Sequence, residues 1–253
     1  MIDDLRGKIA FVTGSARRVG RAIALEFAKE GCNLVIHHSS PRSADDAQDT
    51  AEEARALGVE TMVTSGDQSK PEDVERIFGE IKDHYGRLDI MINSAAIFKR
   101  TDLLDISYEE WQQVIGINLS GPFMNTQHAA RLMIEGGSGG LIVNISDNSG
   151  LNAWASRPHH SISKAGVIML TQVAALSLAQ HAIRVNCVVP GPVLVPAGAG
   201  EEVLDEIAAA LPVGHIGAPL NIANACIFFA KNDFATGSIL RVDGGEGLAG
   251  GET

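Results

Sequence analysis

The stretch Thr13-Gly14-Ser15-Ala16-Arg17-Arg18-Val19-Gly20 decides the fold. It follows a short apolar run at residues 8–13 and leads into a helical pattern at residues 19–30. A glycine-rich turn between a first strand and a first helix is typical of dinucleotide sites, because backbone N–H groups and a helix N-terminus can then face a pyrophosphate. The position of the turn therefore predicts a nucleotide-binding α/β domain.

Short β-type runs alternate with helical patterns along the whole chain. Seven runs rich in Val, Ile and Leu are expected to be strands buried on both faces, at residues 8–13, 33–38, 59–64, 88–93, 140–145, 183–189 and 238–242. Helical patterns occupy residues 19–30, 43–57, 71–85, 108–135, 158–181 and 219–231. The alternation predicts an α/β fold: a single doubly wound Rossmann-type domain over residues 1–253, with a parallel seven-stranded sheet and helices on both faces.

Residues 192–217 interrupt this rhythm. The segment is rich in Pro and Gly at first and then carries a short amphipathic run at 203–211. Long ordered loops in compact domains are often lids over a binding site, so we expect a substrate loop here. The alternative is a disordered surface excursion.

Charge and cysteine content exclude several classes of partner. The net charge of −11 offers no basic field, which argues against nucleic acid or an anionic membrane. Cys32, Cys187 and Cys226 are isolated and lack ligand-like spacing, so we expect a reducing cytoplasm, no disulfide framework and no metal site. No signal peptide precedes the first apolar run, and no stretch approaches the length that spans a bilayer.

The most informative chemical stretch is His160-Ser161-Ile162-Ser163-Lys164, followed by Ala165-Gly166. It resembles the Tyr-x-x-x-Lys segment of the short-chain dehydrogenase/reductase family, with histidine in place of the tyrosine. The turn at 13–20 resembles that family's Thr-Gly-x-x-x-Gly-x-Gly, with Arg18 in place of the middle glycine. The resemblance covers nearly the whole chain and implies a nicotinamide cofactor and a small-molecule substrate.

The cofactor implied by the resemblance is NADP(H) rather than NAD. An arginine at position 18 is similar to the pteridine reductase branch, where it helps to hold the adenosine 2′-phosphate. The second strand ends in His38-Ser39-Ser40, without the acidic residue that would repel a phosphate. The alternative is two solvated arginines at a helix start. The implied cofactor-binding residues are Gly14, Arg17, Arg18, Val19, Gly20, His38, Ser39, Ser40, Asp67, Asn93, Ser94, Ala95, Lys164, Pro190, Gly191 and Val193.

The resemblance also implies the catalytic residues. Lys164 and Asn118 match the family's lysine and asparagine, and the serine expected thirteen residues before position 160 is Asp147. Asp147, like a ring-stacking Phe98, again resembles pteridine reductases. The opposing charges of Lys164 and Asp147 would leave the His160 imidazole able to exchange protons near neutral pH. An Asp–His pair also resembles the base of a nucleophilic triad, but no well-placed nucleophile is evident.

The sequence thus predicts an NADP(H)-dependent oxidoreductase that transfers a hydride to or from a carbonyl or C=N bond, with a pteridine-like compound as one candidate substrate. The alternative is an NADP(H)-binding protein without redox activity, such as a sensor, regulator or lyase. The family resemblance further implies a homo-oligomer, a tetramer or dimer, that pairs through the helices at 108–135 and 158–181. Apolar side chains there, Val173 and Leu176 among them, could equally pack on the sheet.

Overall fold

The computed structural model describes residues 4–194 and 200–249. One sheet runs through the molecule in the strand order β3-β2-β1-β4-β5-β6-β7, and every neighbouring pair of strands is parallel. The strands are β1 (Ile9–Val12), β2 (Asn33–His38), β3 (Thr61–Ser65), β4 (Ile90–Asn93), β5 (Gly140–Ile145), β6 (Ile183–Pro190) and β7 (Ile239–Val242). The predicted doubly wound sheet of seven parallel strands is confirmed.

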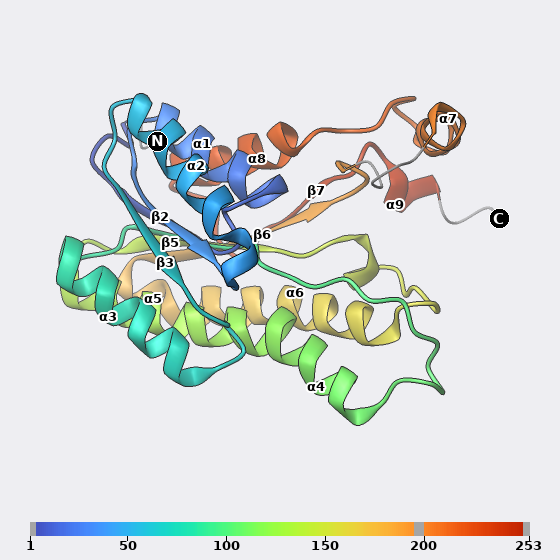
Figure 1. Cartoon of the computed structure of the whole chain (residues 1–253), viewed down its shortest axis with the longest axis horizontal. Coiled ribbons are helices and arrows are strands. Elements are labelled where there is room, and N and C mark those ends of the chain that lie inside the picture. Colours follow the sequence, from blue (N-terminus) through green and yellow to red (C-terminus); the bar gives the residue numbers. More distant parts are fainter. Residues whose placement is uncertain (1–3, 195–199, 250–253) are drawn as a thin grey trace.

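Helices cover both faces of this sheet (Figure 1). One face carries α1 (Arg18–Lys29), α2 (Ala44–Ala56) and α8 (Pro219–Lys231). The other carries α3 (Pro71–Tyr85), α5 (Gly121–Gly136) and α6 (Pro158–Leu178). The remaining helical elements are η1 (Pro41–Ser43), α4 (Tyr108–Ile115), η2 (Gly116–Ser120), η3 (Asn148–Gly150), η4 (Ala179–His181), α7 (Glu201–Ala209) and α9 (Glu246–Ala249).

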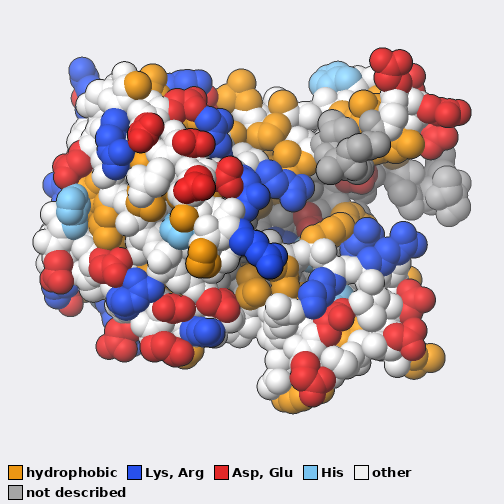
Figure 2. Space-filling view, in the orientation of Figure 1, with side chains coloured by type: hydrophobic (Ala, Val, Ile, Leu, Met, Phe, Trp, Pro, Cys, Tyr) orange, Lys and Arg blue, Asp and Glu red, His pale blue; other side chains and the backbone are white. Residues whose placement is uncertain are grey.

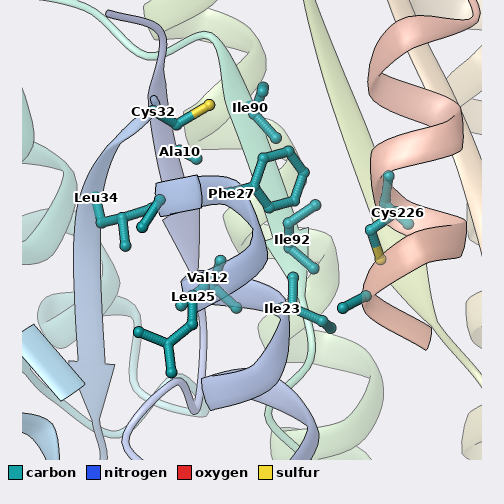
Figure 3. Close-up of a cluster of buried hydrophobic side chains, with 14 of the residues drawn as sticks. Ala10, Val12, Ile23, Leu25, Phe27, Cys32, Leu34, Ile90, Ile92 and Cys226 are labelled. Carbon is teal, nitrogen blue, oxygen red and sulfur yellow. The ribbon is translucent and has the colours of Figure 1, made fainter. Parts of the chain in front are cut away.

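The alternation of side chains along β1 explains the two buried cores. Ala10 and Val12 point into the cluster under α1 and α8, whereas Ile9 and Phe11 point into the cluster under α3 and α5. Figure 3 shows the first cluster, where Phe27 of α1 lies among side chains of β1, β4 and α8. Strands buried on both faces need apolar residues at every position, which is why periodicity of two is absent from the sequence.

The single helix expected at 108–135 is instead three consecutive pieces. α4 and α5 are joined by the π-helical turn η2. Such turns within a helix are frequent at functional sites, because they change the direction of one side chain. Here the turn contains Asn118, which is buried.

The segment predicted as a lid contains α7, which corresponds to the amphipathic run at 203–211. Residues 195–199 of this segment lie outside the described part of the chain. The role of the segment as a lid remains a prediction.

Contrary to expectation, one helical stretch is long enough to span a bilayer. Residues Pro158–His181 have a mean hydropathy of 1.5 and pass by length and composition alone. In the fold, this stretch packs against β6 and α5, and it carries the buried side chains of His160 and Lys164. Of its most apolar window, 33% is buried, so packing within the fold accounts for only part of this apolar character.

The sheet has a switch point between β1 and β4, where the chain reverses the direction in which strands are added. In doubly wound sheets, ligands bind beyond the carboxyl ends of the strands at such a point. The loops after β1, β4, β5 and β6 meet at this edge, and they carry most of the predicted site residues.

Candidate active site and cofactor site

The glycine-rich turn is packed too closely to admit side chains at two positions. A Cβ at Gly14 would lie 3.1 Å from Ala95, and Gly14 has a φ of +67°. A Cβ at Gly20 would lie 2.4 Å from the Gly14 carbonyl oxygen. The turn therefore brings its backbone N–H groups close to the start of α1, as a pyrophosphate site requires.

Arg18 adopts the left-handed backbone conformation, with a φ of +56°. This is the position at which the family motif has its middle glycine, so the backbone keeps the geometry of a glycine while the side chain has changed. The conformation costs a non-glycine residue about 1–2 kcal/mol. The Arg18 side chain is exposed and forms no hydrogen bond or ion pair with the described residues. Strain of this kind is found mainly where function requires the residue.

His37 contacts the glycine-rich turn and is a site residue that the sequence did not predict. Its Nδ1 accepts a hydrogen bond from the Gly14 N–H at 3.1 Å, and its Nε2 lies 2.9 Å from the Gly66 carbonyl oxygen. These two partners fix the neutral tautomer with the proton on Nε2. Burial lowers the pKa of His37 to about 4. Its polar partners come from β1 and β3 and are far away in sequence, so no local pattern could have revealed this role.

The residues after β2 are arranged without a carboxylate at the strand end. His38 Nδ1 donates to the Ser40 carbonyl oxygen at 2.9 Å, and Ser39 is exposed. Arg17 Nε pairs with Asp46 Oδ2 of α2 at 2.9 Å. Arg17 is therefore partly neutralised, which leaves Arg18 as the cation with no carboxylate partner among the described residues.

Two of the predicted cofactor residues are held in place by Thr13. Its Oγ1 accepts hydrogen bonds from the backbone N–H groups of Ser94 and Ala95, each at 3.0 Å. This clamps the loop after β4 against the glycine-rich turn. Asn93 behaves differently: it is 3% exposed, and its amide bonds to Asn144 Oδ1 at 2.8 Å. Its side chain thus lies beneath the site and positions the strands.

The remaining predicted cofactor residues lie at other strand ends. Asp67 Oδ1 accepts hydrogen bonds from the backbone and side chain of Ser69, at 3.0 and 2.7 Å. Pro190 ends β6, and a Cβ at Gly191 would lie 2.6 Å from the Asp243 Cα. The Val193 side chain is part of the core, so only its backbone faces outward. Val19 is half-buried on the first turn of α1.

Asp147 and His160 form a hydrogen-bonded pair beyond the carboxyl end of β5. Asp147 follows β5, and His160 lies in the first turn of α6. His160 Nε2 is 2.6 Å from Asp147 Oδ2. Lys164, one turn further along α6, is 5% exposed and donates from Nζ to the Ile145 carbonyl oxygen at 3.0 Å. The three residues therefore surround the end of β5.

Asn118 holds the other side of the imidazole. Its Oδ1 accepts the Ile97 N–H and its Nδ2 donates to the Ile97 carbonyl oxygen, each at 2.9 Å. These bonds fix the orientation of the amide, so Nδ2 faces His160 Nδ1 at 3.3 Å. The neutral imidazole then carries its proton on Nε2, toward Asp147, and accepts at Nδ1.

Charge and burial set the protonation of the neighbouring groups. Burial is the largest influence on the Asp147 carboxyl and opposes its ionisation, but the His160 hydrogen bond and the Lys164 charge together outweigh it and lower its pKa. Burial lowers the pKa of the Lys164 ammonium, and Asp147 partly opposes this. The Asp147 side chain is 20% exposed and that of His160 is 2% exposed. The carboxylate is thus the member of the pair that a substrate meets first.

Aromatic residues border the pair. The Phe98 ring is 56% exposed and lies edge to face with His160, with ring centroids 4.6 Å apart. Trp154 contacts Phe98 in the same manner at 6.3 Å, and the Arg157 guanidinium lies over the Phe98 ring. One ring face is therefore covered by Arg157.

His159, which the sequence suggests is a simple neighbour of His160, is fully buried and has a partner of its own. Its Nε2 is 2.9 Å from Glu110 Oε1, which links α6 to α4. Successive residues on a helix point in different directions, so His159 turns away from Asp147.

No tyrosine substitutes for the missing one. The chain has two, and Tyr85 donates its hydroxyl to the Leu34 carbonyl oxygen between α3 and β2. Tyr108 is exposed in the first turn of α4 and forms no hydrogen bond with the described residues. Proton transfer at this site would therefore depend on Asp147 and His160.

Comparisons with known proteins agree with this geometry. Residues 14–246 match the family described as enoyl-(acyl carrier protein) reductase. The chain is 35% identical to 3beta-hydroxysteroid dehydrogenase 1 of Eggerthella lenta over 97% of this chain and 95% of that protein. It is 32% identical to L-rhamnose 1-dehydrogenase (NAD(P)(+)) of a Sphingomonas species, over 95% and 96%. A solved short-chain type dehydrogenase/reductase of Mycobacterium marinum is 30% identical, with a TM-score of 0.88 over 96% of each chain.

Proposed function

Since the chain belongs to the short-chain dehydrogenase/reductase family of nicotinamide-dependent oxidoreductases, we propose that it interconverts an alcohol and a carbonyl, or an amine and a C=N bond, with NADP(H) as its cofactor. The observation that carries the proposal is the Asp147–His160 hydrogen bond beside the buried Lys164. It provides a proton-exchanging pair where the family resemblance leads us to expect a tyrosine and a serine.

The bound nicotinamide supplies or accepts the hydride, and the side chains manage the proton. In oxidation, the substrate hydroxyl donates its proton to the exposed carboxylate of Asp147, while the Nε2–H of His160 stays hydrogen-bonded to Oδ2 at 2.6 Å. In reduction, Asp147 returns the proton to the new alkoxide. His160 supports both steps because its N–H stabilises the ionised carboxylate that each step uses or regenerates. Positioned proton transfer of this kind contributes about 10²–10⁴-fold to a rate.

The choice of NADP(H) rests on the charges around the glycine-rich turn. Arg18 has no carboxylate partner among the described residues, and residues 38–40 carry no acidic side chain to repel a phosphate. A guanidinium suits a phosphate because its fork of N–H groups matches the oxygens. Arg18 lies in the glycine-rich turn itself, with a left-handed backbone conformation.

Phe98 supports a flat substrate, of which a pteridine-like compound is one example. Its exposed ring lies against His160, so a stacked substrate would lie close to the proton-exchanging pair. Arg157 covers one face of the ring, so a flat substrate would use the other face or displace the guanidinium. The relatives act on a hydroxysteroid and a sugar according to their names, and those classes belong in any substrate screen.

A second candidate is a protein that binds NADP(H) without redox chemistry. The observation that favours it is that both His160 nitrogens already have protein partners, Asp147 and Asn118. In that case the pair would be a structural feature of a regulatory, sensory or lyase protein.

Two measurements separate these candidates. A ligand that binds only the native state raises stability by about RT ln(1 + [L]/Kd), so NADP⁺ or NADPH should raise the melting temperature under either candidate. Steady-state oxidation of NADPH with aldehydes, ketones, sugars and pterins then tests turnover. Turnover by the wild type supports the reductase. Turnover that appears only in His160→Tyr supports the cofactor-binding protein. The absence of any change in melting temperature with NADP⁺ or NADPH would contradict both candidates.

We further propose that the protein works in the cytoplasm as a homo-oligomer, a dimer or tetramer. On α6, Val173 and Leu176 are 53% and 83% exposed, and Phe123 on α5 is 50% exposed. Exposed apolar side chains gathered on neighbouring helices are typical of a subunit interface.

A further inference from the structure

Arg157 places a positive charge beside the proton-exchanging pair. It directly precedes α6, and its guanidinium carbon lies 4.3 Å from the centroid of the Phe98 ring. That ring lies 4.6 Å from the His160 imidazole, centroid to centroid. A single aromatic side chain therefore separates the guanidinium from the residues that exchange the proton.

This guanidinium has no polar partner in the part of the chain that the structure describes. Its Nε is buried without a hydrogen bond, and none of its N–H groups pairs with a carboxylate or a carbonyl oxygen. Arg76, by contrast, bonds to Asp73 and Glu80. Buried donors without partners are rare in folded proteins, and one that lies beside a reactive pair calls for a functional explanation.

We infer that Arg157 binds an anionic group of the substrate, a carboxylate or a phosphate, while the reacting carbon of the same molecule lies at the Asp147–His160 pair. This inference rests on the proposed function. The planar fork of a guanidinium matches two oxygens of either anion, and this guanidinium is held beside the pair by its contact with the Phe98 ring. Because Phe98 lies between the two sites, the anionic group is several bonds away from the reacting carbon.

The net charge of the protein gives a cation at this position a role in the binding of an anionic substrate. A net charge of −11 repels an anionic substrate as it approaches. Figure 2 shows several Lys and Arg side chains beside the hollow on this face of the molecule, whereas the rest of the face carries a mixture of acidic and basic side chains. A local cation beside the reacting group overcomes the general repulsion.

The test compares substrates that differ only in charge. The probes are 3-hydroxybutyrate and 4-hydroxypentanoate against their primary amides, and glycerol 3-phosphate against glycerol, each with NADP⁺ and with NAD⁺. Wild-type protein is expected to prefer the anionic member by about 10- to 100-fold in kcat/KM, since charge-assisted bidentate bonds are strong. The carboxylate and phosphate pairs show which anion is bound.

Arg157→Gln should remove this preference by raising KM for the anionic member, and leave the neutral member unchanged. Arg100→Gln is the matched control. Arg100 is exposed, lies two residues beyond Phe98 and has no ring contact in the described part of the chain, so this substitution removes the same charge without changing the Phe98 contact. Equal use of both members by wild-type protein, or an equal loss for both in Arg157→Gln, would overturn the inference while the redox function stands.

If no probe is oxidised, the redox function is judged by the substrate screen described above, and binding decides the inference. Melting temperatures of the NADP⁺-saturated protein are then measured with millimolar anionic or neutral probe. Stabilisation by the anion alone, lost in Arg157→Gln and kept in Arg100→Gln, supports an anion site. An equal rise in melting temperature in the wild type, Arg157→Gln and Arg100→Gln, or no rise in the wild type, contradicts an anion site at Arg157.

Discussion

The Nε2 atom of His160 lies 2.6 Å from Oδ2 of Asp147, and both residues stand where the family resemblance leads us to expect uncharged hydroxyl side chains. A tyrosine and a serine would offer two hydroxyl groups to a substrate oxygen. This pair offers a carboxylate that reaches solvent and a buried imidazole behind it. The substitutions are therefore coupled: an ionised Asp147 needs the His160 N–H, and His160 needs an acceptor for its Nε2 proton.

The imidazole orientation should depend on Asn118. Asn118→Ala removes the donor to His160 Nδ1 and leaves the Ile97 backbone groups without partners, so we expect a fall in kcat and a loss of about 1–3 kcal/mol in the free energy of unfolding. Kinetics and denaturant unfolding measure both. Asn125→Ala, which removes a buried amide without contact to His160, should lower stability while kcat changes little. Equal loss of kcat in both variants would contradict a positioning role.

The Arg18 side chain should lower the stability of the fold and raise the affinity for NADP⁺. Arg18→Gly removes a side chain from a left-handed backbone position, so we expect the free energy of unfolding to rise by about 1 kcal/mol. The same change should weaken NADP⁺ binding and leave NAD⁺ binding unchanged, as read by titration. Arg21→Ala on the same helix is the control, because Arg21 is paired with Glu53. Unchanged preference between the two nucleotides in Arg18→Gly would exclude the proposed phosphate contact.

His37 should make the fold sensitive to acid. Its folded pKa of about 4 lies below the unfolded value of 6.5, so the unfolded state binds more protons between these values. The stability that neutral His37 contributes is complete above pH 6.5 and is lost as the pH falls toward 4, by up to about 3 kcal/mol. His37→Asn should flatten this limb of the stability profile, measured by denaturant unfolding at each pH. His181→Gln, at an exposed histidine, should leave this part of the stability profile unchanged. A flatter profile in His181→Gln would show that the loss of stability at acid pH is not specific to His37.

The exposed apolar residues of α6 should lie in a subunit interface. Val173→Glu and Leu176→Glu place charges on the exposed face of the helix, and we expect smaller particles in light scattering with little change in monomer folding. Leu104→Glu, at a side chain that is 96% exposed in the loop before α4, should leave particle size unchanged. A wild-type protein that is already monomeric would contradict the proposed assembly.

The fold could be predicted because each strand is a compact apolar run and each helix follows it in sequence. The π-helical turn at Asn118 could not, since its composition is that of an ordinary helix and only the packing of α4 and α5 requires it. The family resemblance implied that Asp147 and His160 lie together, and the structure places one just after β5 and the other in the first turn of α6. The roles of His37 and Arg157 depend on partners from distant parts of the chain, which the sequence does not bring together.

The most direct measurement is the kcat of His160→Phe against the wild type at saturating NADPH and substrate. Phenylalanine keeps an aromatic ring beside Phe98 but cannot exchange a proton or bond to Asp147. We predict that kcat falls by about 10²–10⁴-fold while the Kd for NADPH is unchanged. A variant that keeps the wild-type kcat would show that proton transfer does not depend on His160.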